Sequence, residues 1–274
     1  MDLYPHHLAT WSRQRVEAAI RRRVQTAYLG AGVVLARVLG RHKIFLRSAD
    51  LGFACHLMLD GFWEIWLTQY LASCVKSGMT VIDVGANYGY YTLLLADAVG
   101  ETGRVIAVEP NPDAVALLLQ SVQLNGHAGR VHIVPHALSA GAGKRLLYVP
   151  AAEPKNATLV DRADLSGGRT VEVCTVTLDE IALSYPKVDL VKIDAEGSEQ
   201  EIVAGMSGLI ARDRPMLVLE YNAARYANPR AFLDELLAAY NTAEELELTG
   251  DIVPINVDSV ANSGNRYDRL LLFR

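Results

Sequence analysis

Short apolar segments alternate with longer amphipathic segments through most of this 274-residue chain, and this alternation constrains the fold more than any other feature. The apolar segments are rich in Val and Ile and nearly continuous in hydrophobicity, as buried parallel strands are. They cover residues 80–84, 104–109, 131–135, 188–194 and 216–220, and two last strands are expected at 243–248 and 270–274. Helical spacing fills intervals at residues 91–99, 112–124, 199–210 and 229–240. We therefore predict an α/β fold with a mostly parallel sheet and helices on both faces.

Two regions depart from this alternation. Residues 144–176 contain two β-like runs and several glycines, which predicts a hairpin or flap inserted into the main fold. Residues 44–59 contain short apolar runs and predict a small hairpin or strand that covers the sheet. Because no long linker interrupts the chain, we expect an N-terminal arm and cover segment at residues 1–59, followed by one domain at residues 60–274.

The N-terminal segment combines helical spacing with positive charge. Apolar residues recur at helical intervals over residues 8–38, which predicts one long or two shorter amphipathic helices with a break at Gly30 and Gly32. Residues 1–50 hold nine Lys and Arg against three acidic residues, although the whole chain has a net charge of −5. An arm at residues 8–41 fits three roles: packing on the main domain, pairing two copies in a homodimer, or peripheral contact with an anionic membrane.

The composition excludes several classes of protein. The negative net charge is unlike that of nucleic-acid-binding proteins. Cys55, Cys74 and Cys174 are far apart and form no CxxC motif, which argues against a disulfide framework and favours a reducing compartment. No secretory signal is recognisable after Met1, and the apolar run at residues 27–36 is too short for a membrane span of ~20 residues. We therefore expect a cytoplasmic protein, with peripheral attachment to the inner membrane face as the alternative.

A glycine-rich turn follows the first predicted strand. The sequence VIDVGANYGY at residues 81–90 places Gly85 and Gly89 where a strand passes into a helix, so the backbone can approach a ligand closely. The spacing is GxNxG, with Asn87 between the glycines, rather than the dinucleotide-binding GxGxxG. Asp83, at the end of the strand, is placed to accept a hydrogen bond from a cationic amine.

Carboxylates follow two further strands at the same edge of the predicted sheet. Glu109 ends the second strand, where a carboxylate can accept hydrogen bonds from both hydroxyls of a ribose. Together with the glycine turn, Glu109 predicts an adenosine-containing ligand. Asp194, Glu196 and Glu199 follow the fourth strand, and ligands of open α/β sheets bind along that edge.

With this third group of residues, the sequence resembles the FkbM family of Class I S-adenosylmethionine-dependent methyltransferases. The resemblance covers roughly residues 60–274 and rests on IDVGANYGYYT at 82–92, VEPNP at 108–112, TLDEI at 177–181 and KIDAEGSE at 192–199. It implies a Rossmann-like, seven-stranded sheet and transfer of a methyl group from S-adenosylmethionine, usually to a hydroxyl. The acceptors it implies are small molecules or glycans, often sugars or secondary metabolites. A lipid-linked acceptor would suit the membrane role of the basic N-terminal arm.

The resemblance also implies a cofactor site built from three turns. The residues it assigns to S-adenosylmethionine are Asp83, Gly85, Asn87, Gly89 and Glu109 for the methionine and ribose, and Asn111, His136 and Ala137 for the adenine. Many Class I enzymes have an acidic residue where this chain has His136, so main-chain groups are expected to recognise the adenine there. Glu64, in the segment GFWE at residues 61–64, is expected to reach the same pocket.

Asp194 and Glu196 are the candidate catalytic residues. The donor methyl group is already activated on a sulfonium, so the enzyme mainly aligns the reactants, and a hydroxyl acceptor gains from a general base. The sequence DAEG at this position differs from the Asn/Asp-Pro-Pro-Tyr segment of many amine methyltransferases. Alternatively, Asp194 only orients neighbouring amides and Glu199 only forms an ion pair on a helix. Grouped carboxylates also suit Mg²⁺, but no His–Asp pair adjoins them in the sequence, and we assign no metal ligand.

We therefore predict an O-methyltransferase that acts on a sugar, a glycan or a glycosylated metabolite. A nicotinamide-dependent dehydrogenase shares the glycine turn and the acid after the second strand. However, none of the 12 tyrosines has a lysine four positions later, so the Tyr-x-x-x-Lys pair of short-chain dehydrogenases is missing. A catalytically silent cofactor-binding scaffold is the second alternative, and the intact glycines and acidic residues argue against it.

Overall fold

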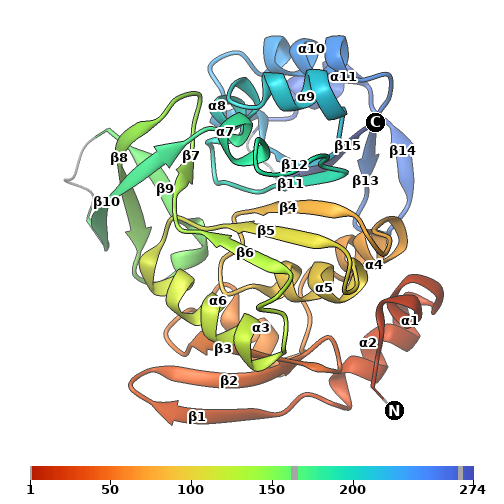
Figure 1. The fold of residues 1–274 in the computed structure, drawn as a ribbon, viewed down its shortest axis with the longest axis vertical. Helices are drawn as coiled ribbons and strands as arrows, with labels where there is room; N and C mark the ends of the chain where they lie inside the picture. The colour runs from red at the N-terminus through yellow and green to blue at the C-terminus, as the bar shows by residue number, and fades with distance from the viewer. Residues whose placement is uncertain (1, 162–165, 265–267) are drawn as a thin grey trace.

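The computed structural model describes residues 2–161, 166–264 and 268–274, and an eight-stranded sheet lies at its centre (Figure 1). The strand order is β14-β13-β15-β12-β11-β4-β5-β6. The five parallel strands are β4 (Thr80–Val84), β5 (Arg104–Val108), β6 (Val131–Val134), β11 (Leu190–Ile193) and β12 (Met216–Tyr221). Antiparallel pairing adds β15 (Arg269–Phe273), β13 (Ala243–Leu246) and β14 (Ile252–Pro254). The predicted α/β class is confirmed, and β14 is a short edge strand beyond the seven expected.

Helices cover both faces of this sheet, as the alternation predicts (Figure 1). One face carries α4 (Ile65–Cys74), α5 (Tyr90–Ala98) and α6 (Pro112–Leu124), and the other carries α7 (Leu178–Ala182), α8 (Glu199–Ala204), α9 (Ser207–Asp213), α10 (Pro229–Ala239) and α11 (Val257–Ala261). Successive strand residues point to opposite faces, so Val81 belongs to one buried cluster and Ile82 to the other. The core therefore has two layers with the sheet between them.

The helix predicted over residues 199–210 is in fact two short helices, α8 and α9, that are separated at Gly205. A Cβ atom on Gly205 would lie 2.3 Å from the carbonyl oxygen of Ser139, so only glycine permits this close approach of two backbones. The tertiary contact thus decides where the helix ends, and the apolar spacing of the sequence contains no sign of it.

The N-terminal prediction is correct only for its first part. Helices α1 (Pro5–Thr10) and α2 (Arg13–Arg21) form, but residues 26–38, predicted as helix, are strands. An antiparallel sheet joins β1 (Thr26–Gly30), β2 (Val33–Val38) and β3 (His42–Arg47). Gly30, Ala31 and Gly32 all have positive φ, which suits a tight hairpin turn rather than a helix break. Burial alternates along β2, as expected for a half-buried strand.

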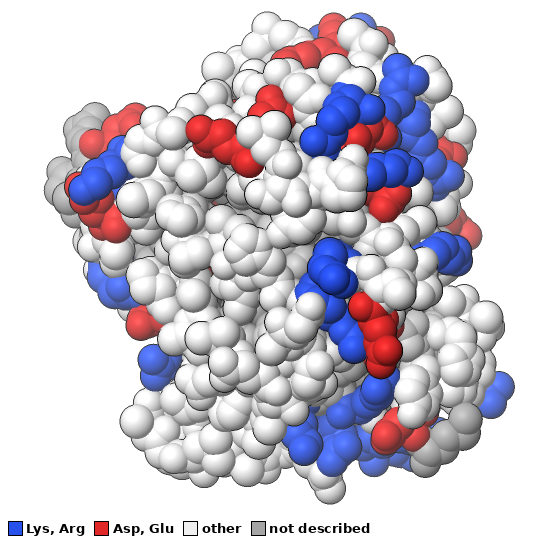
Figure 2. Space-filling view, in the orientation of Figure 1, with Lys and Arg blue, Asp and Glu red and all other residues white. Residues whose placement is uncertain are grey.

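The N-terminal segment packs directly on the main fold. Leu8, Val16 and Ile20 belong to the same buried cluster as Leu71 of α4. Strand β3 is bonded to α6, because the amide of Phe45 donates to Ser121 Oγ at 3.0 Å. Figure 2 shows basic side chains gathered around α1 and α2 on the lower part of the viewed face. No helix among the described residues is long and apolar enough to cross a membrane.

A second sheet occupies the region predicted as an inserted hairpin. Its order is β7-β10-β8-β9, formed by β7 (Ala137–Leu138), β8 (Gly143–Pro150), β9 (Thr158–Val160) and β10 (Gly168–Val176). Between β8 and β9 lies the short 3-10 helix η1 (Pro154–Asn156). In the region predicted as a small cover, β3 is followed by helix α3 (Ala54–Leu59). Residues of the second sheet and of η1 line the main cavity of the protein, as described below.

Candidate active site

The main cavity lies where four parallel strands end. Val84, Glu109, Asp194 and Glu220 stand at the ends of β4, β5, β11 and β12, and all four line it. The cavity encloses about 1050 Å³, counting the part that is open to solvent. The chain crosses from one side of β4 to the other between β6 and β11, so this edge is the topological switch point where open α/β sheets bind ligands.

The glycine turn between β4 and α5 forms one wall of the cavity. Gly85 has φ of +74°, and a Cβ atom there would lie 1.9 Å from the carbonyl oxygen of Asp194. The structural reason for this glycine is therefore contact with the loop after β11, in addition to the predicted approach to a ligand. Gly89 has φ of +101° and begins α5, packed against Leu118. Asn87 also has a positive φ, of 49°, and lines the cavity.

Glu109 lies at the cavity wall with its carboxylate fixed by two backbone amides. The amide of Asn87 donates to Oε2 and that of Asn111 to Oε1, both at 2.8 Å. Burial raises the pKa of Glu109 to about 7, although these two hydrogen bonds act in the opposite direction. The arrangement holds the carboxylate still while each oxygen keeps a lone pair for a ligand hydroxyl.

The residues expected at the adenine end also reach the cavity. Asn111, His136 and Ala137 line it, together with Leu138. The Oδ1 atom of Asn111 accepts from the amide of Asp113 and caps α6, which leaves its amide nitrogen for other contacts. The Nδ1 atom of His136 is buried and has no hydrogen-bond partner among the described residues.

Asp83 was expected to contact the ligand, but the structure places it outside the cavity lining. Its side chain is fully buried, it is absent from the lining residues, and Thr92 Oγ1 donates to it at 2.6 Å. Lys192 Nζ lies 3.6 Å from its other oxygen, so Asp83 faces a protein cation rather than open space. Asp83 therefore acts on the site through Lys192.

Lys192 is the main site residue that the sequence analysis missed. It stands on β11, is 2% exposed and lies 3.4 Å from Asp194 Oδ2. Burial by itself lowers the pKa of Lys192, but the carboxylates of Asp194 and Asp83 outweigh burial and raise it, so the ammonium stays charged. A lysine inside an otherwise apolar strand is a sequence signal that could have revealed this group.

The two predicted catalytic carboxylates have different partners. Asp194 is about one-third exposed, lines the cavity, and has Lys192 as its ion-pair partner. Glu196 pairs with Arg225 at 2.7 Å, and burial followed by the charge of Asp194 raises the pKa of Glu196 to about 7. Asp194 therefore has the more accessible carboxylate for an acceptor.

A third carboxylate, which the sequence analysis did not assign, joins this pair. One oxygen each of Asp194, Glu196 and Glu220 lies within 4.8 Å of the others. Burial and the neighbouring carboxylates raise the pKa of Glu220 well above its ordinary value. Arg225, in the 3-10 helix η2 (Ala223–Arg225), lies 2.9 Å from Glu220 and brings positive charge to these carboxylates.

Glu199 organises the loop that carries the catalytic candidates. Its Oε1 atom accepts from the amides of Ala195 and Gly197 at 3.0 and 3.1 Å, and the hydroxyl of Tyr226 donates to its Oε2 atom. Glu199 is fully buried, so it is neither a surface ion-pair residue nor a base within reach of an acceptor. Its amide contacts fix the course of the chain between Asp194 and α8.

Glu64 reaches the cavity from the opposite wall, as expected. It precedes α4 in a left-handed conformation, and the hydroxyl of Tyr91 donates to it at 2.8 Å. Burial, followed by the charge of Asp194, raises the pKa of Glu64 to about 7. The unliganded protein therefore favours a protonated Glu64 at mildly acidic pH.

This raised pKa predicts a pH-dependent stability. The folded state binds a proton on Glu64 more tightly than the unfolded state, so stability falls as pH rises from about 4.5 to about 7. Glutamine cannot lose a proton, so the stability of Glu64→Gln does not fall in this way. Above about pH 7, its free energy of unfolding is expected to exceed that of the wild type by up to about 3 kcal/mol. Urea unfolding at about pH 5 and about pH 8 measures it, with exposed Glu101→Gln as the control. An equal effect of Glu64→Gln at both pH values would contradict the assignment.

The strand arrangement and the site together define a Class I methyltransferase fold. The parallel strands carry a glycine turn and an acid at their ends, and β15 inserts antiparallel between β12 and β13. Residues 83–246 match the family model described as the methyltransferase FkbM domain. Because this match covers more than half of the chain, the protein belongs to the FkbM family of methyltransferases.

Individual relatives are more distant. The hexuronic acid methyltransferase AglP of Haloferax volcanii is 26% identical over 171 residues, which cover 58% of this chain and 67% of that protein. A protein-L-isoaspartate O-methyltransferase of Aeropyrum pernix is 36% identical over 100 residues, covering 35% of this chain and 38% of that protein. A crystal structure of an FkbM methyltransferase from Methylobacillus flagellatus KT has 17% identity and a TM-score of 0.48, covering 72% of this chain and 44% of that chain.

Family membership makes the protein a methyltransferase and implies S-adenosylmethionine as its methyl donor. The predicted family is thereby confirmed, and the nicotinamide-dependent alternative is set aside. The relatives named above are matched over about two-fifths to two-thirds of their length. Their acceptors therefore do not transfer to this chain by similarity alone.

Proposed function

We propose that this protein is an O-methyltransferase that transfers the methyl group of S-adenosylmethionine to a hydroxyl of a sugar, a glycan or a glycosylated metabolite. The observation that carries the proposal is the position of Asp194, whose accessible carboxylate lies in the cavity at the end of β11. A hydroxyl must lose its proton as it attacks a sulfonium-bound methyl group, and a carboxylate at this place can accept that proton.

The cavity fits the adenosine cofactor that the family implies. Glu109 has a carboxylate held by two amides at one wall, suited to the two ribose hydroxyls. The unpartnered Nδ1 atom of His136, beside Ala137, is a polar group at the proposed adenine end. Asn87 and Gly85 line the wall proposed for the methionine part. When bound, S-adenosylmethionine supplies an activated methyl group on its sulfonium.

Side chains at the ends of the strands are assigned to proton transfer and to positioning of the acceptor. We assign Asp194 as the general base, and Lys192, 3.4 Å away, as the cation that pairs with this carboxylate. Glu196 is tied to Arg225, so we assign it to acceptor positioning together with its pair. The hydroxyl of Thr158 on β9 donates to the carbonyl oxygen of Glu196 at 2.8 Å, which connects the covering sheet to the catalytic loop.

The acceptor class follows from the walls of the cavity. Lys155, in η1, lines the same cavity as Asp194 and brings a second cation to it. An acidic sugar, like the hexuronic acid in the name of the AglP relative, offers both a hydroxyl for Asp194 and a carboxylate for a lysine. We therefore propose sugar acids as the first acceptors to test.

The Glu109 assignment predicts a loss of cofactor affinity. Glu109→Ala is expected to weaken S-adenosylhomocysteine binding by about 10- to 100-fold, because a charge-assisted hydrogen bond contributes ~1.5–3 kcal/mol. Isothermal titration calorimetry measures the change, and thermal unfolding shows whether the variant is folded. The exposed Glu101→Ala serves as the matched control. Unchanged affinity in a folded Glu109→Ala protein would remove Glu109 from the cofactor site.

The N-terminal segment is proposed to cover the main fold rather than insert into a membrane. The apolar residues Leu8, Val16 and Ile20 are buried inside this chain, so helices α1 and α2 have no free apolar face for lipid. Tyr28 and Leu29, near the tip of the β1–β2 hairpin, are 68% and 53% exposed and offer an apolar contact to a membrane or a second subunit. Leu51 and Leu59, further along the same segment, are exposed as well.

This arrangement predicts that the protein does not sediment with vesicles of anionic lipid at physiological salt. Charge attraction contributes about 1 kcal/mol per basic residue near such a surface and is screened by salt. Co-sedimentation, compared between the wild type and a Tyr28→Ser/Leu29→Ser double variant, measures it. If the wild type sediments with the vesicles and the double variant does not, the hairpin contacts the membrane. Analytical ultracentrifugation of the wild type and the double variant tests whether two copies form a homodimer through this hairpin.

A further inference from the structure

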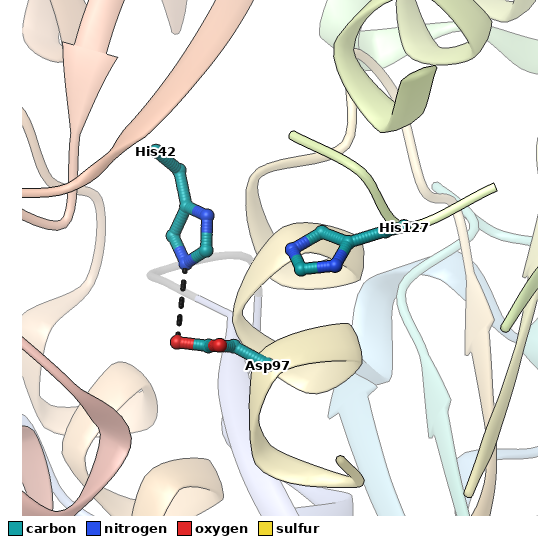
Figure 3. A group of neighbouring side chains, drawn as sticks. All are labelled: His42, Asp97 and His127. Carbon is teal, nitrogen blue, oxygen red and sulfur yellow. Dashed lines mark ion pairs between the residues drawn. The ribbon is translucent and has the colours of Figure 1, made fainter. Parts of the chain in front are cut away.

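Three side chains of metal-binding types meet on the side of the protein away from the main cavity. His42 comes from β3, Asp97 from the last turns of α5, and His127 from the turn after α6. One potential ligand atom of each lies within 4.8 Å of the others. Figure 3 shows the three side chains converging from these separate parts of the chain, with His42 Nε2 3.5 Å from Asp97 Oδ2.

The side chain of His127 is buried within this group. Its side chain belongs to a residue only 4% exposed, and neither ring nitrogen has a hydrogen-bond partner in the part of the chain that the structure describes. Figure 3 shows one nitrogen of this ring turned toward His42 and Asp97. Buried imidazole nitrogens are normally satisfied by a protein group, a water or a metal, so the nitrogen that faces His42 and Asp97 is a candidate metal ligand.

We propose that His42, Asp97 and His127 bind a Zn²⁺ ion. Two imidazole nitrogens and one carboxylate oxygen are ligands that Zn²⁺ takes in proteins, with a water or another group in the fourth position. Imidazole disfavours Mg²⁺ and Ca²⁺, which prefer oxygen ligands. Arg41 Nη1 donates to Asp97 at 2.6 Å, and a hydrogen bond of this kind orients a ligating carboxylate.

The local structure brings these ligands together before any ion arrives. The amide of Lys43 donates to Asn125 Oδ1, and Asn125 Nδ2 donates back to the carbonyl oxygen of Lys43. This pair of bonds fixes β3, next to His42, against the end of α6, two residues before His127. The ring centroids of His42 and His127 are 5.5 Å apart, which leaves room for an ion between the rings after small rotations.

The location indicates a structural role for this ion. Helix α5 begins at the glycine turn beside the cavity, whereas Asp97 lies at its other end. The ion would tie three parts of the protein together: the N-terminal sheet through β3, helix α5, and the segment that leads into β6. The inference is independent of the proposed methyl transfer, because none of its ligands lines the main cavity.

The test compares metal content and thermal stability in the full-length protein. After removal of metals with a chelator, the wild type is expected to take up one more equivalent of Zn²⁺ than His127→Ala, measured by inductively coupled plasma mass spectrometry. At a Zn²⁺ concentration about 100 times the Kd, the melting temperature of the wild type is expected to rise by about 5 °C or more. The rise is expected to be absent in His127→Ala and present in the exposed control His132→Ala.

Two further measurements keep the proposal testable if His127→Ala does not fold. Asp97→Asn and His42→Ala each remove a different ligand and are expected to lose the same equivalent of Zn²⁺. Co²⁺ bound to the wild type is expected to give the strong visible absorption of a four-coordinate site, and the ligand variants are expected to lack it. Equal Zn²⁺ stoichiometry in the wild type and in all folded ligand variants would overturn the proposal.

Discussion

Asp194→Asn is expected to lower kcat by about 10²- to 10⁴-fold while S-adenosylhomocysteine binds as in the wild type. Asparagine has the shape of aspartate but cannot accept the proton of an attacking hydroxyl. The carboxylate of Asp194 lies in the cavity and is about one-third exposed, so its loss affects the reaction more than the packing. Initial rates at saturating acceptor, together with calorimetric titration of S-adenosylhomocysteine, measure the two effects separately.

Two further variants show whether the lower kcat of Asp194→Asn results from the loss of the general base. Asp258→Asn changes an aspartate whose side chain is 80% exposed on α11, and is expected to leave kcat unchanged. Glu196→Gln is expected to raise KM more than it lowers kcat, because Glu196 is held by Arg225. A nearly normal kcat in Asp194→Asn would leave Asp194 with a structural role. Activity abolished by EDTA and restored by Mg²⁺ would instead make Asp194 a metal ligand.

Lys192→Met is expected to destabilise the protein by about 3–5 kcal/mol. The substitution leaves Asp83 fully buried without its ion-pair partner, and removal of one member of a buried pair has an effect of this size. Urea unfolding at neutral pH measures the change in the free energy of unfolding. Lys144→Met is the matched control, because Lys144 forms an exposed pair with Glu172 that contributes ~0–1 kcal/mol.

A double variant tests whether the charge of Asp83 is the cause. Lys192→Met combined with Asp83→Asn is expected to be less destabilised than the sum of the two single variants, because no fully buried charge is then left without its partner, and Asp194 is one-third exposed to solvent. Additive effects of the two substitutions would show that Lys192 stabilises the protein through its packing instead.

The sequence predicted the central sheet well because its strands are buried on both faces. Their continuous Val and Ile runs stand out from the amphipathic helices between them, and strand ends such as Val84 were located to the residue. The order of parallel strands then brings Glu109 and Asp194 to one edge, so the main features of the site followed from the strand positions. Glu64 and His136, which the sequence also assigns to the cofactor, line the cavity, and their contact with the cofactor stays a prediction.

The parts that the sequence did not predict depend on contacts between distant segments. The apolar spacing of residues 26–38 fits a helix, whereas the pairing of β1 with β2, and of β2 with β3, makes this segment part of a sheet. Glu220 ends a predicted strand, but the sequence analysis assigned it no role, and Arg225 follows that strand without a motif, yet the fold brings both to Glu196. Asp83 was expected to contact the ligand because it precedes the glycine turn. In the structure its carboxylate faces the ammonium group of Lys192 instead.

Methyl transfer to a panel of sugars tests the account most directly. The protein is incubated with S-adenosylmethionine and neutral or acidic sugars, and the products are analysed by mass spectrometry before and after mild alkaline treatment. We expect the wild type, but not Asp194→Asn, to form a sugar that carries one additional methyl group in a base-stable ether. A methyl group recovered on nitrogen, or as a base-labile ester of a sugar carboxylate, would contradict it.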